Sequence, residues 1–282
     1  MTAYMDHKDL TNETIEPRRA AEIRDGARRV LDRIATAELE AGRPEGSVTL
    51  LAATKTRDVG EIMAAIDAGV RMVGANRPQE LVAKIDGLRY CCSQRGLTVG
   101  VHDFDVEDGN DPSAMATVDS THIPVHLIGQ LQANKIGKIL PYANVVESVD
   151  SLDLATKIAR RAVVRGNAVG VMLEVNESGE ESKSGCRPEE ACDLAGAIGE
   201  LDGVELTGLM TIGAHVDDET EIRRCFADLR GLRDRIAASG MTGTAGCREL
   251  SMGMSGDMEL AIREGATIVR VGTAIFGPRA FI

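Results

Sequence analysis

Residues 48–74 read VTLLAATKTRDVGEIMAAIDAGVRMVG, and this stretch contains the unit from which the fold can be predicted. It opens with a short apolar run, Val48–Thr54, which is typical of a strand buried on both faces. A helical pattern follows over Asp58–Ala68, and a second apolar run extends from Arg71 to Gly74. Strand, helix and strand in this order predict one parallel β/α unit.

The same alternation continues along the rest of the chain. Counting the two runs above, eight strand candidates are interleaved with helices, and eight such units in about 240 residues is the usual size of a (β/α)8 TIM-type barrel. We predict that barrel, and an open, doubly wound parallel sheet is the competing interpretation. The further strand candidates are Pro124–Ile128, Asn144–Ser148, Ala168–Val175, Val204–Met210, Glu249–Met252 and Thr267–Val271. The further helix candidates are Pro78–Leu88, Gln132–Leu140, Ser151–Arg165, Pro188–Ile198, Asp217–Ala238 and Asp257–Glu264.

Two segments fall outside the eight units. Helical spacing of apolar residues predicts an extra N-terminal helix over Thr11–Ala41. The segment Cys91–Ile123 is acidic and rich in Gly, Ser, Thr and Asp, so we expect a long, mobile insertion with His102 and His122 exposed. Nothing else breaks the pattern, and residues 1–282 are predicted to form a single barrel domain.

The composition excludes several classes of protein. The formal net charge is −12 and no basic run interrupts the acidic excess, so no nucleic-acid-binding role is expected. No apolar stretch approaches the roughly 18 residues that a membrane-spanning helix needs, and the N-terminus lacks the apolar segment of a signal peptide. The six cysteines include no CxxC pair, which argues against a metal site and favours reduced thiols in the cytoplasm.

Lys55 is the first candidate functional residue. Functional groups in such barrels lie at the C-terminal ends of the strands, and Lys55 directly follows the apolar run LLAAT. Burial there would lower the pKa of its amine and make it a nucleophile for a carbonyl group. The alternative is a lysine that only extends to solvent or forms an ion pair at a strand end.

Two turns rich in small residues indicate a phosphate site. They are LSMGMSGD (residues 250–257) and VRVGTAIFG (residues 269–277), and each follows a predicted strand. Either turn alone is weak evidence, but the pair matches the phosphate site formed after the last two strands of many barrels. Barrel closure places the last strand beside the first, so Lys55 faces Gly272 and Thr273. A lysine amine beside a phosphate site suggests an aldehyde phosphate held as a Schiff base. Both pyridoxal 5′-phosphate (PLP) and aldolase substrates qualify.

The order of several motifs then identifies a family. The segments LLAATKT, GANRPQEL, HLIGQLQANK, ESVDS, EVNESGEESKSG, GLMTIG, LSMGMSGDMELAI and VRVGTAIFG resemble the pyridoxal phosphate homeostasis protein family, which shares its barrel with the N-terminal domain of alanine racemase. The resemblance implies that Lys55 carries PLP as an internal aldimine and that Asn76 lies near the ring. It further implies that Ser251, Gly272 and Thr273 hold the phosphate and that Arg270 approaches the pyridine nitrogen.

Arg270 limits the chemistry that this resemblance allows. A guanidinium stays protonated, so a pyridine nitrogen facing it remains an unprotonated acceptor and the ring is a poor electron sink. We therefore expect a monomeric carrier or buffer of PLP that serves cofactor and amino-acid homeostasis and exchanges PLP with apo-enzymes, without an established catalytic residue. The alternatives are a PLP-dependent amino-acid racemase of low activity and a phosphate-binding aldolase. His126 is interpreted as a hydrogen-bonded core residue rather than a proton shuttle.

Overall fold

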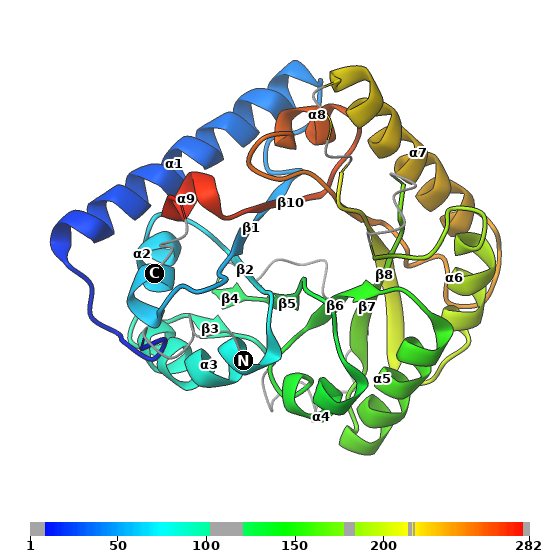
Figure 1. Ribbon diagram of the computed structural model, residues 1–282, viewed down its shortest axis with the longest axis horizontal. Helices are drawn as coiled ribbons and strands as arrows, with labels where there is room; N and C mark the ends of the chain where they lie inside the picture. The colour runs from blue at the N-terminus through cyan, green and yellow to red at the C-terminus, as the bar shows by residue number, and fades with distance from the viewer. Residues whose placement is uncertain (1–8, 102–120, 178–183, 214–215, 217, 279–282) are drawn as a thin grey trace.

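Eight parallel strands close into a barrel that is surrounded by helices (Figure 1). The computed structural model describes residues 9–101, 121–177, 184–213, 216 and 218–278. Because β1 pairs with β2 on one side and with β10 on the other, the predicted TIM-type barrel is confirmed and the open sheet is wrong. Around the barrel, the strands are β1 (Thr49–Ala53), β10 (Ile268–Val271), β9 (Glu249–Ser251), β8 (Val204–Met210), β7 (Val169–Glu174), β6 (Val145–Val149), β5 (Val125–Leu127) and β2 (Met72–Ala75).

Each barrel strand is followed by a helix that packs an apolar face on the barrel. Helix α5 shows the local causes: Ser151 caps its first turn by accepting from the N–H of Leu154, and Gly166 ends it in the left-handed conformation. The helices are α2 (Val59–Asp67), α3 (Pro78–Ser93), α4 (Ile136–Ile139) after a 3₁₀ turn (Ala133–Lys135), α5 (Leu152–Arg165), α6 (Ala191–Gly199), α7 (Glu219–Ala237), α8 (Met258–Arg263) and α9 (Thr273–Phe276). None of the helices described is both long and apolar enough to span a membrane.

The predicted extra helix is present as α1 (Pro17–Glu40), which lies across α2, α8 and α9 (Figure 1). It begins six residues later than predicted because Glu16, which precedes a proline, is extended, and Pro17 then occupies the first turn. Gly26 allows close packing on α9, since a Cβ there would lie 2.5 Å from the carbonyl oxygen of Ile275.

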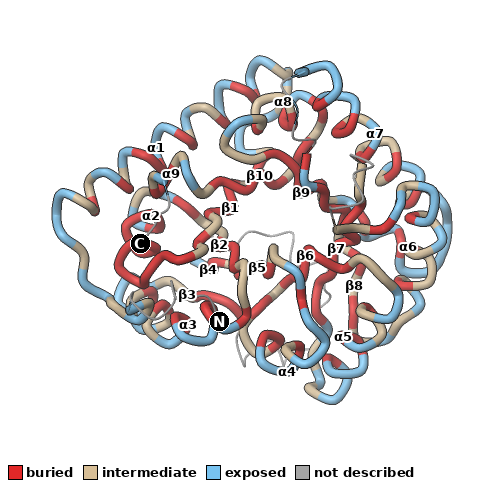
Figure 2. The backbone as a smooth tube through the Cα atoms, viewed as in Figure 1, coloured by how far each residue is buried: buried red, intermediate tan, exposed pale blue. Residues whose placement is uncertain are grey.

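Five buried apolar side chains, one each from β1, β6, β7, β8 and β10, form a cluster inside the barrel. We call them the apolar layer, and a larger apolar core contains side chains of both the strands and the helices. Figure 2 shows that the barrel strands are mostly buried and that the exposed backbone lies on the outer side of the helices. Since side chains alternate along a strand, the residue two positions further toward the C-terminal end faces the same interior. The members of the apolar layer are Leu51, Val145, Met172, Met210 and Ile268.

The insertion is shorter than predicted and its ends are built into the fold. Helix α3 continues to Ser93 because Leu88 and Cys92 extend its buried face, and both side chains are fully buried. Strands β3 (Thr98–Val99) and β4 (His122–Ile123) then pair in parallel. His122 is half-buried, with its ring 2.9 Å from the hydroxyl of Thr98, so the expectation that it is exposed is wrong. Residues 102–120, including His102, lie outside the described residues.

Candidate functional site

Lys55 lies at the mouth of the barrel, in the turn between β1 and α2, and is half-buried. Leu51 of the apolar layer lies four residues earlier on β1, and the strand ends at Ala53, two residues before Lys55. The register pairs Ala52 of β1 with Val271 of β10. A Cβ at Gly272 would lie only 3.3 Å from the carbonyl oxygen of Ala53, so the structure brings the Lys55 turn and the Gly272 turn together as predicted.

The Lys55 turn has an unusual backbone that its neighbours hold. Thr56 has a φ of 62°, the left-handed region that a β-branched residue rarely adopts. Its N–H donates to Oε2 of Glu80 at 2.8 Å, and Nζ of Lys84 donates to the carbonyl of Thr54 at 3.0 Å. Both partners lie on α3, so the second β/α unit fixes the turn that carries Lys55.

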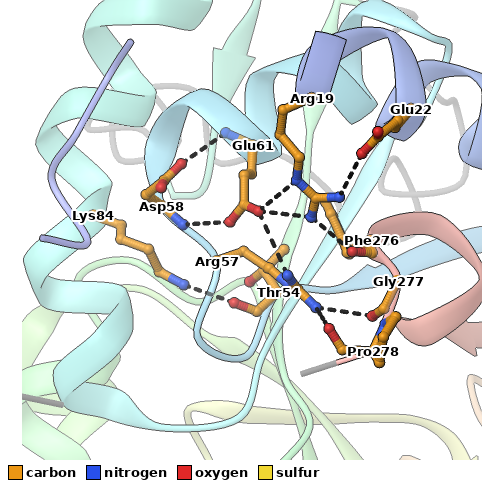
Figure 3. Close-up of polar contacts among 10 residues, drawn as sticks. All are labelled: Arg19, Glu22, Thr54, Arg57, Asp58, Glu61, Lys84, Phe276, Gly277 and Pro278. Atoms are coloured by element: carbon orange, nitrogen blue, oxygen red, sulfur yellow. Dashed lines mark hydrogen bonds and ion pairs between the residues drawn. The ribbon is translucent and has the colours of Figure 1, made fainter. Parts of the chain in front are cut away.

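Two arginines connect this turn to the other end of the chain (Figure 3). The guanidinium of Arg57 lies 5.4 Å from the ring centre of Phe276 and donates to the carbonyl of Gly277 at 3.0 Å. Arg19 of α1 donates to the carbonyl of Phe276 at 2.7 Å, and both arginines contact Glu61. We call this set the arginine clamp, and it ties α1, α2 and the segment after α9 to the Lys55 turn.

Next to the apolar layer, a chain of hydrogen bonds crosses the barrel. The ring of His126 lies 2.6 Å from one oxygen of Glu147, and the hydroxyl of Ser251 donates to the other oxygen at 2.5 Å. Arg270 donates to the Ser251 hydroxyl and to the carbonyl of Thr211, both at 2.7 Å. All five residues are buried, which confirms the interpretation of His126 as a hydrogen-bonded core residue.

Two carboxyl groups in this layer have opposite pKa shifts. Burial alone would raise the pKa of Glu147, but its hydrogen bond with His126, the charges of His126 and Arg270, and Ser251 outweigh burial and lower it. Burial together with the charge of Asp150 raises the pKa of Glu174 to about 7, and Arg270 only partly opposes this rise. At neutral pH, Glu147 is therefore a carboxylate, whereas Glu174 is present in both its protonated and its ionised form.

The other predicted site residues lie around these groups. Asn76 follows β2 directly, and its Oδ1 is buried without a hydrogen-bond partner among the described residues. Thr273 is exposed at the mouth beside Gly272. Ser251 is fully buried, and both Glu147 and Arg270 bind its hydroxyl. The hydroxyl that reaches the turn after β10 belongs to Ser255, which lies 3.4 Å from the backbone nitrogen of Ala274.

Glu147, Glu174 and Ser255 are candidates that the sequence interpretation did not single out. Glu147 stands in the run VVESV and Glu174 ends the run VGVMLE, and both runs are completely buried. A carboxyl group in a buried strand needs a partner, so an acidic residue inside an apolar run was an available signal. Ser255 lies within the quoted turn LSMGMSGD, where spacing alone does not distinguish it from Ser251.

Comparisons with known proteins agree with this geometry. The family model described as "Alanine racemase, N-terminal domain" matches residues 37–280. Pyridoxal phosphate homeostasis proteins from Aquifex aeolicus (strain VF5) and Escherichia coli (strain K12) are 36% and 35% identical over 253 residues, with 90% and 89% of this chain and 96% and 94% of each relative covered.

Solved structures show the same similarity. A protein from Bifidobacterium adolescentis, described as unknown, is 65% identical with a TM-score of 0.88, and 95% of this chain and 100% of that chain are covered. PipY of Synechococcus elongatus, solved with PLP bound, is 30% identical with a TM-score of 0.67, over 88% of this chain and 100% of that chain. An alanine racemase of Clostridium difficile, 16% identical with a TM-score of 0.64, shares the fold. The chain belongs to the pyridoxal phosphate homeostasis protein family, with the barrel of the alanine racemase N-terminal domain.

Proposed function

We propose that the protein binds PLP reversibly at the mouth of its barrel, as a Schiff base on Lys55, and serves PLP and amino-acid homeostasis. The observation that carries the proposal is the position of Lys55: a half-buried lysine in a fixed turn at the end of β1, next to the Gly272 turn. The names of the relatives and the PLP in PipY support it.

The residues at the mouth fit this cofactor. The backbone at Gly272 and Thr273, with the hydroxyl of Ser255 nearby, provides small donors for a phosphate group. Asn76 offers a buried oxygen whose hydrogen-bonding capacity is unused among the described residues, as expected of a group that faces a ligand. Arg270 offers a fixed guanidinium inside the barrel. When bound, PLP supplies an aldehyde that condenses reversibly with an amine.

The protein's own residues favour holding the cofactor over transforming a substrate. Arg270 stays charged, and Ser251 and Thr211 fix its orientation, so a pyridine nitrogen near it stays unprotonated. Such a ring withdraws electrons weakly, so reactions that form a carbanion on a bound amino acid are disfavoured. The proposal therefore describes a carrier whose PLP another amine releases by displacing Lys55. Exchange of the α-proton of alanine or serine by purified protein would instead indicate the racemase.

Reduction with borohydride tests the proposal. PLP added to the purified protein should give a visible absorption band, and reduction followed by peptide mapping should place the label on Lys55. The variant Lys55→Ala should lose the band and the label, whereas Lys138→Ala, a change at an exposed lysine, should keep both. Label on Lys135, Lys138 or Lys183 instead of Lys55 would overturn the assignment.

The proposed role in homeostasis includes a location in the cell and a class of partner proteins. In the proposal, the protein is a cytoplasmic monomer that delivers PLP to apo-enzymes. Loaded protein should restore the activity of a PLP-dependent apo-enzyme when a phosphatase destroys free PLP, and Lys55→Ala treated in the same way should not. Equal recovery with both proteins would contradict delivery.

A further inference from the structure

Glu174 ends the strand opposite β1, the strand that leads into Lys55. Strand β7 lies four strands from β1 in either direction around the closed barrel. Met172 belongs to the apolar layer, so Glu174, two residues later at the C-terminal end of β7, faces the interior at the mouth. A ligand attached to Lys55 would lie between the two.

One oxygen of the Glu174 carboxyl group has no hydrogen-bond partner among the described residues. The residue is 3% exposed, and its Oε2 is buried without a hydrogen-bond partner among the described residues. In Glu147, on the neighbouring strand, both carboxyl oxygens are hydrogen-bonded. A buried acceptor left unpaired costs about 1–3 kcal/mol, so a group that satisfies Oε2 when the site is filled is the expected explanation.

The charges around Glu174 make its ionisation sensitive to a ligand. Asp150, which follows β6, and Arg270 of β10 face it and act in opposite directions. Together with burial, they place its pKa at about 7. A further negative charge in this low-dielectric interior would disfavour the carboxylate, because charges interact strongly where water is excluded.

We propose that Glu174 is a ligand-contacting residue whose free oxygen takes up a proton from solvent and donates it in a hydrogen bond when a phosphorylated pyridine binds. One O–H bond forms in this step: the carboxylate becomes a carboxylic acid, and the buffer acid that supplies the proton becomes its conjugate base. The inference rests on the proposed function and adds a residue, and a proton, to its binding step.

Pyridoxine 5′-phosphate is the appropriate probe, because it has an alcohol in place of the aldehyde and does not react with Lys55. Its binding is measured calorimetrically in two buffers of different ionisation enthalpy, above about pH 7, where a phosphate monoester with a pKa of about 6 is already a dianion. The difference between the buffers gives the protons taken up per ligand.

The wild-type protein should take up a fraction of a proton, and its affinity should fall by at most about tenfold per pH unit as pH rises. Glu174→Gln should remove both the uptake and the pH dependence while still binding the probe. Glu177→Gln is the matched control, since burial and Asp228 also raise the pKa of Glu177 to about 7, but this residue lies beside Cys225 of α7. Glu177→Gln should keep the uptake.

The outcomes separate the two proposals. No proton uptake by the wild type, or uptake that survives in Glu174→Gln, overturns the role of Glu174 even where borohydride labels Lys55. A protein that binds neither PLP nor the probe overturns the proposed function and this inference with it. Thermal unfolding of each variant verifies that it is folded, and the wild-type measurement alone remains decisive if Glu174→Gln does not fold.

Discussion

On β6 and β7, a member of the apolar layer and a buried carboxyl group occupy successive inward positions. Val145 precedes Glu147 by two residues, and Met172 precedes Glu174 by two. From one inward position to the next, the barrel interior changes from apolar side chains to buried carboxyl groups. The comparison shows that these strands change from apolar to charged inward residues toward their C-terminal ends, the end at which TIM-type barrels carry their functional groups.

The two polar positions differ from each other as well. Glu147 is bonded to His126 and Ser251, so its charge is compensated within the protein. Glu174 has an unpaired oxygen and a raised pKa, so its compensation is incomplete. Removing a compensated charge should therefore destabilise the fold, and removing the uncompensated one should stabilise it.

Placing a carboxyl group in the apolar layer should have the largest effect on the free energy of unfolding. Met172→Glu should prevent folding, or lower the free energy of unfolding by at least about 5 kcal/mol, because an unpaired buried carboxylate costs several kcal/mol. Met172→Leu, a volume-conserving control, should change it by less than about 1.5 kcal/mol. Urea unfolding followed by circular dichroism measures both. A Met172→Glu protein as stable as wild type would show that this layer admits water.

Removing Glu147 should have the second largest effect. Glu147→Ala removes the carboxylate that His126 and Ser251 contact and one of the negative charges acting on the buried Arg270, and it should lower the free energy of unfolding by about 3–5 kcal/mol. Glu147→Gln keeps an acceptor for Ser251 and should lose less. Equal stability of wild type and Glu147→Ala in urea would mean that the hydrogen-bond chain contributes nothing.

The pH dependence gives an independent check on Glu147. Its pKa is lowered below the ordinary 4.5 in the folded protein, so its ionisation stabilises the fold above about pH 4.5. This contribution should disappear as pH falls through the lowered pKa. Acid titration of wild type against Glu147→Gln should show the loss in the wild type alone.

Removing the carboxyl group of Glu174 should raise the free energy of unfolding, whereas removing that of Glu147 should lower it. The pKa of Glu174 is raised from 4.5 to about 7, so its ionisation destabilises the fold progressively across this interval. Glu174→Met should raise the free energy of unfolding by up to about 3 kcal/mol above pH 7 and by little near pH 4.5. Urea unfolding at the two pH values measures the difference, and a pH-independent gain would argue against the raised pKa.

Shortening the insertion should have the smallest effect, because it enters between α3 and β5, at the end of the barrel away from Lys55. A short Gly-Ser linker in place of residues 102–120 should change the free energy of unfolding by about 1–2 kcal/mol and keep the borohydride label. A cut that starts at Cys91 should destabilise more, since it removes the buried Cys92, Val99 and Ile123. Loss of the label in the shorter deletion would mean that the insertion reaches the mouth.

Much of the fold could be predicted because its signals are local. Apolar runs and helical spacing identified all eight barrel strands. Element ends were less accurate: the predicted helix Gln132–Leu140 is a 3₁₀ turn followed by α4. The pairing of β3 with β4 could not be predicted, because it joins two-residue strands across the insertion.

The site was predictable only in part. Lys55 and Gly272 could be placed together because barrel closure fixes which strands are neighbours. The bond between Ser251 and Glu147 joins residues 104 positions apart, and which inward side chains meet across a barrel depends on packing that no sequence period records. The roles of Asn76, Ser251, Arg270, Gly272 and Thr273 toward PLP remain predictions.

The arginine clamp also determines when the site can form. Arg57 lies 220 residues before Gly277, and at about 5–20 residues per second a ribosome needs about 10–40 s to make the intervening chain. During that interval, the nascent chain contains Lys55 but not the carbonyl groups of Phe276 and Gly277, to which Arg19 and Arg57 donate. The arginine clamp and the pairing of β1 with β10 can therefore form only after the last strand of the barrel has been made.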